Sequence, residues 1–185
     1  MKAQVVYESM FGDGRIIAES IADGLLQAGL DASAIEVGGA ATTIPLDLDL
    51  LIVGGPNHQF GLSRESTRRE AARHSDAGVV SDRIGIREWL TELDHNRGGT
   101  KSVSYDTRMG HPKMLTTMDH ASHTIAKALR RAGFTSLDKP RHFLVVDMRG
   151  PLVDGEPDRA RAWGRRLADL LSADAGTDAA PSPDL

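Results

Sequence analysis

This sequence predicts a single doubly wound α/β domain, in which a parallel sheet of five strands carries helices on both faces. Short β-rich segments near residues 5, 33, 50, 103 and 144 alternate with helical patterns. Such alternation is typical of parallel strands joined by right-handed crossovers. The run DLDLLIV at 47–53 also becomes continuously apolar, as expected for a parallel strand that helices cover on both faces.

The composition of the 185 residues is that of one soluble globular domain. Hydrophobic residues make up 40% and charged residues 26%, and no apolar run is long enough to span a bilayer. The formal net charge of -4 gives no overall attraction to nucleic acid or to anionic lipid, so neither is an expected partner. The absence of cysteine excludes disulfides, thiolate metal ligands and a cysteine nucleophile. Because Met1–Tyr7 enters a strand pattern without a secretory signal, we expect a cytoplasmic protein.

The elements follow one another along the chain. AQVVY at 3–7 predicts the first strand, and Ile17, Ile21 and Leu25 recur at helical spacing behind a glycine-containing loop. Trp89 and Trp163 fall on apolar helix faces and are predicted core residues. Further helices are predicted at 64–73, 85–94, 121–132 and 160–171, and further strands at 101–105 and 142–146. The domain is expected to cover 1–172, followed by a polar, disordered tail at 173–185.

Three loops lie where ligands bind in such sheets, at the carboxyl ends of the strands: 8–14, 56–62 and 104–110. The first, ESMFGDG, leads into a helix whose unpaired N–H groups and positive dipole end favour a phosphate or carboxylate. The alternative is an ordinary tight turn in which Ser9 satisfies the backbone. A dinucleotide motif would need glycine in place of Ile17, and a P-loop would need Gly-Lys-Ser/Thr, so both are excluded.

Four stretches of the sequence carry a family resemblance. In chain order they read VVYESMFGDGRIIAESIADGL, LLIVGGPNHQFGLSRESTR, YDTR and GPLVDGEPDRARAWG. Together they resemble the flavodoxin family, and especially the flavodoxin-domain proteins common in high-GC bacteria. The resemblance implies a flavodoxin-like flavoprotein that binds FMN non-covalently. It also implies electron transfer with a redox partner protein that supplies the electrons, or a small flavin-dependent reduction by an oxidoreductase.

The resemblance also implies a binding role for each loop. The first would hold the FMN phosphate through the Ser9 hydroxyl and backbone N–H groups, and the second would border one side of the flavin ring. In the third, Tyr105 would stack on the ring and Asp106 would accept a hydrogen bond from a flavin N–H. The expected cofactor-binding residues are Ser9, Met10, Phe11, Gly12, Asp13, Gly14, Pro56, Asn57, His58, Gln59, Phe60, Gly61, Tyr105, Asp106 and Thr107. No catalytic residue and no metal ligand is assigned.

The first loop departs from the family pattern. Flavodoxins place hydroxyl residues at the positions of Phe11 and Gly14, and a neutral residue at Asp13. Each hydroxyl donor to a charged phosphate contributes on the order of 1.5 to 3 kcal/mol. The Asp13 carboxylate would repel a phosphate unless it points to solvent or is paired, for example with Arg15. The second hypothesis is therefore a binding or regulatory module that keeps the fold and has lost FMN.

Two other features leave alternatives open. His58 in the second loop could contact a flavin or a substrate, which gives a third hypothesis, a flavin-dependent reductase for a quinone or similar acceptor with His58 or Tyr105 near that acceptor. His120 and His123, with Asp119 or His111, could hold a metal, but a solvated helix start is the simpler interpretation.

A row of arginines also follows the second loop. It is either a docking face for an acidic redox partner or a solvated helix face, and it consists of Arg64, Arg68, Arg69 and Arg73.

Overall fold

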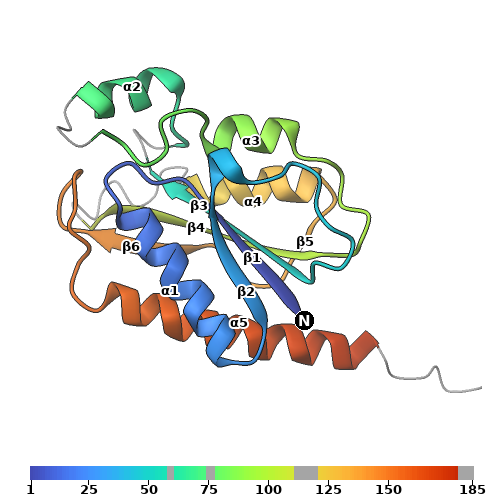
Figure 1. The fold of residues 1–185 in the computed structure, drawn as a ribbon. Coiled ribbons are helices and arrows are strands. Elements are labelled where there is room, and N and C mark those ends of the chain that lie inside the picture. The colour runs from blue at the N-terminus through green and yellow to red at the C-terminus, as the bar shows by residue number, and fades with distance from the viewer. Residues whose placement is uncertain (58–60, 74–77, 111–120, 179–185) are drawn as a thin grey trace, which may run out of the picture.

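The computed structural model describes residues 1–57, 61–73, 78–110 and 121–178. Its centre is a parallel sheet (Figure 1), whose strands are β1 (Lys2–Tyr7), β2 (Asp31–Glu36), β3 (Leu50–Pro56), β4 (Lys101–Met109), β5 (Thr135–Ser136) and β6 (Arg141–Val145). The strand order is β2-β1-β3-β4-β5, and β6 also pairs with β4. The predicted doubly wound α/β class is confirmed.

The fifth position of the sheet is made by two strand segments. β5 pairs with the beginning of β4 through Lys101 and Ser102, and β6 pairs with the rest of β4, from Tyr105 to Met109. Residues 137–140 separate the two segments and end at Pro140, which has no N–H to donate to the ladder. The five predicted strands are therefore present, the last of them as β6, and β5 is an additional short strand that was not predicted.

Helices cover both faces of the sheet. α1 (Asp13–Gln27) and α5 (Glu156–Asp178) pack on one face, and α3 (Ile86–Glu92) and α4 (Ala121–Arg131) pack on the other. A short 3-10 helix, η1 (Val37–Gly39), follows β2. Figure 1 shows α2 (Glu65–Arg73) beyond the carboxyl end of the sheet, apart from both helical layers. This helix therefore lies near the end of the sheet at which the predicted ligand loops meet.

Two hydrophobic clusters form the core, one on each side of the sheet. In β3, Leu50 and Ile52 belong to the cluster with α1 and α5, whereas Leu51 and Val53 belong to the cluster with α3 and α4. The apolar run at 47–53 predicted a strand buried on both faces, and the structure confirms this. Trp163 lies in the first cluster and Trp89 in the second, which confirms both as core residues.

The end of α5 differs from the prediction. The helix runs to Asp178, so residues 173–178 are helical and not part of a disordered tail. The Lys101 ammonium forms an ion pair of 2.9 Å with the Asp174 carboxylate, which fastens this last part of α5 to the start of β4. No described helix has both the length and the apolar composition needed to cross a membrane.

Candidate functional site

The carboxyl ends of β1, β3 and β4 bring the predicted loops together at one edge of the sheet. The Glu8 N–H donates to the Gly54 carbonyl at 2.9 Å, and the Asn57 N–H donates to the Thr107 carbonyl at 2.9 Å. The first predicted loop therefore starts beside the end of β3, from which the second loop leaves, and the second loop lies beside the third, as the parallel topology requires.

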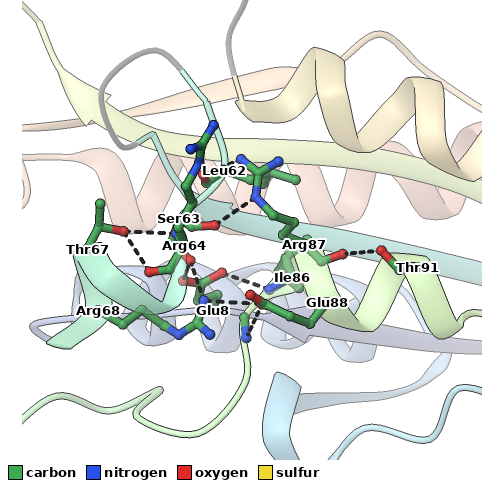
Figure 2. A network of polar contacts seen from close by, with 11 residues as sticks. Glu8, Leu62, Ser63, Arg64, Thr67, Arg68, Ile86, Arg87, Glu88 and Thr91 are labelled. Atoms are coloured by element: carbon green, nitrogen blue, oxygen red, sulfur yellow. Dashed lines mark hydrogen bonds and ion pairs between the residues drawn. The ribbon is translucent and has the colours of Figure 1, made fainter.

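A buried carboxylate stands directly after β1. Glu8 is fully buried and accepts hydrogen bonds from the Ser63 hydroxyl and from the Ile86 N–H, the latter at 2.8 Å. Figure 2 shows these groups converging on Glu8 from the segment after β3 and from the start of α3. Burial raises the pKa of Glu8, and the hydrogen bonds from Ser63 and Ile86 act against this rise.

Arg68 of α2 extends the network around Glu8. Its Nη1 donates to the Ser63 hydroxyl at 3.1 Å and lies 3.2 Å from the Glu88 carboxylate, which also accepts the Gly85 N–H at 2.9 Å. Burial would raise the pKa of Glu88, but the hydrogen bonds from Arg68 and the backbone lower it overall. The sequence placed Arg68 in a row of surface arginines, and the structure corrects this because the residue is buried.

The first loop forms a tight turn around Ser9. The Ser9 hydroxyl accepts the Gly12 N–H at 3.1 Å, and the Ser9 N–H donates to the Ser81 hydroxyl at 3.0 Å. Ser9 is only 1% exposed. Gly12, with φ of 104°, is the N-cap of α1 and leaves the first turn without a side-chain cap. The loop thus combines the two alternatives, a self-satisfied turn at Ser9 and an uncapped helix N-terminus.

The absence of a side chain at Gly14 has a steric reason. A Cβ at this position would lie 2.7 Å from the Glu8 carbonyl oxygen, closer than side chains approach the backbone. The loop therefore excludes a side chain at the position where the family resemblance implies a hydroxyl residue.

A second segment packs along the first loop. The Val80 N–H donates to the Met10 carbonyl at 3.0 Å, and the Ser81 N–H donates to the Ser9 carbonyl at 2.9 Å. Met10 is buried as a result. Sequence reasoning missed this contact because no local pattern relates residues 9–10 to residues 80–81.

Asp13 contacts the segment before α5 and does not pair with Arg15. Its carboxylate accepts the Leu152 N–H, and burial raises the pKa of Asp13 against this hydrogen bond. Arg15 instead lies 3.8 Å from Glu19 on the same helix. Of the possibilities that the sequence left open for Asp13, the structure shows pairing within the chain, with the Leu152 N–H in place of Arg15. It also gives the Asp13 charge a partner in the segment before α5.

Tyr105 is a core residue and not a stacking surface for a ligand. β4 continues to Met109, so residue 105 lies inside the strand and its ring faces the α1 and α5 layer. The ring is fully buried and meets Phe143 and Trp163 edge-on, with centroids 5.8 and 6.4 Å away. A Cβ at Gly54 would overlap this ring, so the neighbouring strand β3 leaves room for the ring by having glycine at this position.

Asp106 caps a helix of its own chain. It is fully buried and accepts the Ser122 N–H at 3.1 Å, and it lies 3.1 Å from His142 Nδ1. Asn57 Oδ1 accepts the adjacent Ala121 N–H at 3.3 Å, so both side chains hold the start of α4. Burial would raise the pKa of Asp106, but His142 and Ser122 lower it overall. The carboxylate is thus already engaged within the chain, and its expected hydrogen bond to a flavin N–H stays a prediction.

Arg108 is a cation at this edge that sequence reasoning missed. It belongs to β4 and shares the sheet face of Asp106, with its Nε 3.9 Å from the Asp106 carboxylate. Its Nη1 is buried and has no hydrogen-bond partner within the described part of the chain. The available signal was the YDTR motif, in which Arg108 is the last residue.

The remaining predicted residues divide between the edge and the undescribed positions. Pro56 ends β3 and Thr107 lies beside Asn57 at the edge, and Gly61 is half-buried, whereas His58, Gln59 and Phe60 lie outside the described residues. His111, Asp119 and His120 are also outside them, and His123 stacks on His142 with centroids 6.0 Å apart. No group of three or more metal-binding side chains occurs among the residues that the structure describes.

Comparisons with known proteins agree with this architecture. No protein-family model and no curated protein matches the sequence. An archaeal flavodoxin structure superposes with a TM-score of 0.57 at 17% identity, over 93% of this chain and 99% of that one. Flavodoxin 1 from Bacillus cereus gives 0.61 at 13% identity, over 91% and 98%.

The chain has the flavodoxin-like fold. The same fold occurs inside a longer protein, the rubredoxin oxygen:oxidoreductase from Desulfovibrio gigas, with a TM-score of 0.63 at 13% identity. There 94% of this chain matches 37% of that one. The flavodoxin-like sheet places its carboxyl edge, with the Ser9 turn, Asn57 and Arg108, where the predicted ligand loops meet.

Proposed function

We propose that this flavodoxin-like chain binds FMN and serves in electron transfer or in a small flavin-dependent reduction. The observation that carries this proposal is the N-terminus of α1. It lies at the carboxyl edge of the sheet, begins at a left-handed glycine and has no side-chain cap. Such a terminus offers backbone N–H groups and a positive dipole end to a phosphate.

The residues present fit the phosphate through the backbone. The N–H groups of Asp13 and Gly14 lie in the uncapped first turn of α1, and the Asp13 carboxylate is engaged by the Leu152 N–H. The Ser9 hydroxyl already accepts a hydrogen bond from Gly12. Ser9 is also only 1% exposed, so the phosphate would be held mainly by backbone groups.

The flavin ring would lie between the second and third loops, beside Asn57 and Thr107. When bound, FMN supplies one- and two-electron chemistry that amino-acid side chains lack. The sequence has no nicotinamide-binding motif, so a partner protein would supply the electrons. A cytoplasmic location stays a prediction from the sequence.

An absorption spectrum of the purified protein, followed by fluorescence titration with FMN and with riboflavin, tests the proposal. We expect both flavins to bind with dissociation constants within about tenfold of each other, because mainly backbone groups hold the phosphate. A colourless protein that changes the fluorescence of neither flavin would overturn the proposal.

The second candidate is a module that keeps the fold without FMN. The observation that favours it is the burial of Ser9, whose N–H donates to Ser81 and whose hydroxyl oxygen accepts the Gly12 N–H. Residues 80–81 also pack along the loop. Recovery of stoichiometric FMN from the heat-denatured protein would rule this candidate out. Tighter FMN binding by Ser81→Ala than by the wild type would show that the packed segment opposes the phosphate.

A further inference from the structure

Arg108 combines a positive charge with an unsatisfied donor at the edge of the sheet. Its side chain is 16% exposed, and its Nη1 is buried without a hydrogen-bond partner in the described residues. A guanidinium is charged at every accessible pH. Leaving a buried charged donor unpaired costs free energy, so such a group in a folded chain calls for an acceptor.

Asp106 does not supply this acceptor. The Arg108 Nε lies 3.9 Å from the carboxylate, beyond hydrogen-bond reach, whereas His142 and Ser122 engage the same carboxylate at 3.1 Å. The carboxylate balances the Arg108 charge at longer range, but it satisfies none of the guanidinium donors. The buried Nη1 of Arg108 is therefore left for an acceptor that is not part of the described chain.

The position of Arg108 connects it to the proposed flavin. Its neighbour Thr107 accepts the Asn57 N–H at 2.9 Å, which is the contact that joins the second and third loops. Arg108 and Asp106 alternate with Tyr105 along β4, and Asp106 contacts α4 whereas Tyr105 faces the opposite layer. Arg108 thus lies next to the junction where the ring would bind, on the face of the core with α4.

We propose that Arg108 binds the flavin ring and stabilises the negative charge that the ring gains on reduction. This inference rests on the proposed function. Two electrons and one proton from an external reductant leave one negative charge on the ring, and the guanidinium pairs with it without releasing a proton. The Asp106 carboxylate stays hydrogen-bonded to His142 and does not occupy the Arg108 donors. The Arg108 charge therefore stabilises the reduced flavin more than the oxidised flavin.

The test compares Arg108→Met and Arg108→Lys with a matched control, Arg141→Met. Arg141 also carries a buried nitrogen without a partner in the described chain, its Nε, and its side chain is 41% exposed. It pairs in register with Tyr105, on the opposite face of the sheet from Arg108. Each methionine variant removes one positive charge, and only the first removes it from the proposed site.

The measurements are the dissociation constant of oxidised riboflavin and the midpoint potential of the bound flavin, obtained by dithionite titration with reference dyes. We expect Arg108→Met to weaken the binding of reduced relative to oxidised flavin at least tenfold. For a two-electron couple, that factor corresponds to a potential lower by about 30 mV. Arg108→Lys keeps the charge and should fall between Arg108→Met and the wild type, and Arg141→Met should match the wild type.

Circular dichroism confirms that each variant is folded, and Arg108→Lys carries the comparison if Arg108→Met unfolds. A potential that is unchanged in the Arg108 variants, or lowered equally by Arg141→Met, overturns the inference while flavin binding stands. A wild-type protein that binds no flavin overturns the proposed function and this inference together.

Discussion

The hydroxyl of Ser63 donates a hydrogen bond to the fully buried carboxylate of Glu8, which joins the segment after β3 to the end of β1. Arg68 and Ile86 complete this contact from α2 and α3, as Figure 2 shows. A polar network as well as the hydrophobic core therefore stabilises the carboxyl edge of the sheet, where the predicted loops meet.

Replacing Glu8 by glutamine should destabilise the protein. The substitution keeps the volume but changes the acceptor of the Ser63 and Ile86 hydrogen bonds, so a loss on the order of 1 to 3 kcal/mol is expected. Urea denaturation measures it as a lower midpoint at constant slope. Glu65→Gln is the matched control, because that carboxylate lies 64% exposed on α2 and its removal should cost little. Equal midpoints for both variants would contradict a structural role of Glu8.

The cost of Glu8→Gln should also depend on pH. Burial raises the pKa of Glu8 above its ordinary value of 4.5, so the folded protein binds the Glu8 proton more tightly than the unfolded chain does. The resulting stabilisation is complete below pH 4.5 and is lost as the pH rises through the raised pKa. The difference in unfolding free energy between wild type and Glu8→Gln should therefore shrink with rising pH, and a difference that grows would refute the raised pKa.

Asp106→Asn should show the opposite pH dependence. His142 and Ser122 lower the pKa of Asp106 below its ordinary value of 3.8, so its stabilisation is present above that pH and is lost as the pH falls through the lowered pKa. Denaturation at neutral pH should give a destabilisation on the order of 1 to 3 kcal/mol, which decreases in acid. A cost that does not change with pH would argue against an ionised Asp106.

Restoring a hydroxyl residue at the first loop should not restore a phosphate site. In Gly14→Ser the new Cβ would lie 2.7 Å from the Glu8 carbonyl, so the loop must shift and the protein should lose stability. We expect a lower urea midpoint and no tightening of FMN relative to riboflavin. Gly176→Ala in α5 is the control, since nothing lies within 4 Å of its Cβ and alanine favours a helix. Tighter FMN binding by Gly14→Ser would contradict this account.

Tyr105→Phe should leave flavin binding unchanged and keep or increase stability. The phenol oxygen is buried without a hydrogen-bond partner in the described chain, so its removal relieves a cost of about 1 to 3 kcal/mol at most. The ring contacts with Phe143 and Trp163 remain. Thermal unfolding and the riboflavin titration check both expectations, and weaker riboflavin binding would instead place Tyr105 at the ligand.

The fold class and the edge of the sheet that carries the loops could both be predicted from local patterns in the sequence. The alternating apolar patterns, the run at 47–53 and the glycine loop before α1 depend on local periodicity, which a chain displays without knowledge of its neighbours. The same periodicity placed Trp89 and Trp163 in the core, and the structure agrees.

The contacts of the individual side chains at this edge could not be predicted in the same way, because they depend on how distant segments pack. Whether β4 ends at residue 105 or at Met109 is not visible in a short run of mixed polarity, yet it sends Tyr105 into the core and leaves Arg108 at the edge. Glu8 and Ser63, or Ser9 and Ser81, meet only when distant segments pack together. Hydrogen bonds of this kind depend on position in space, which local sequence patterns do not encode.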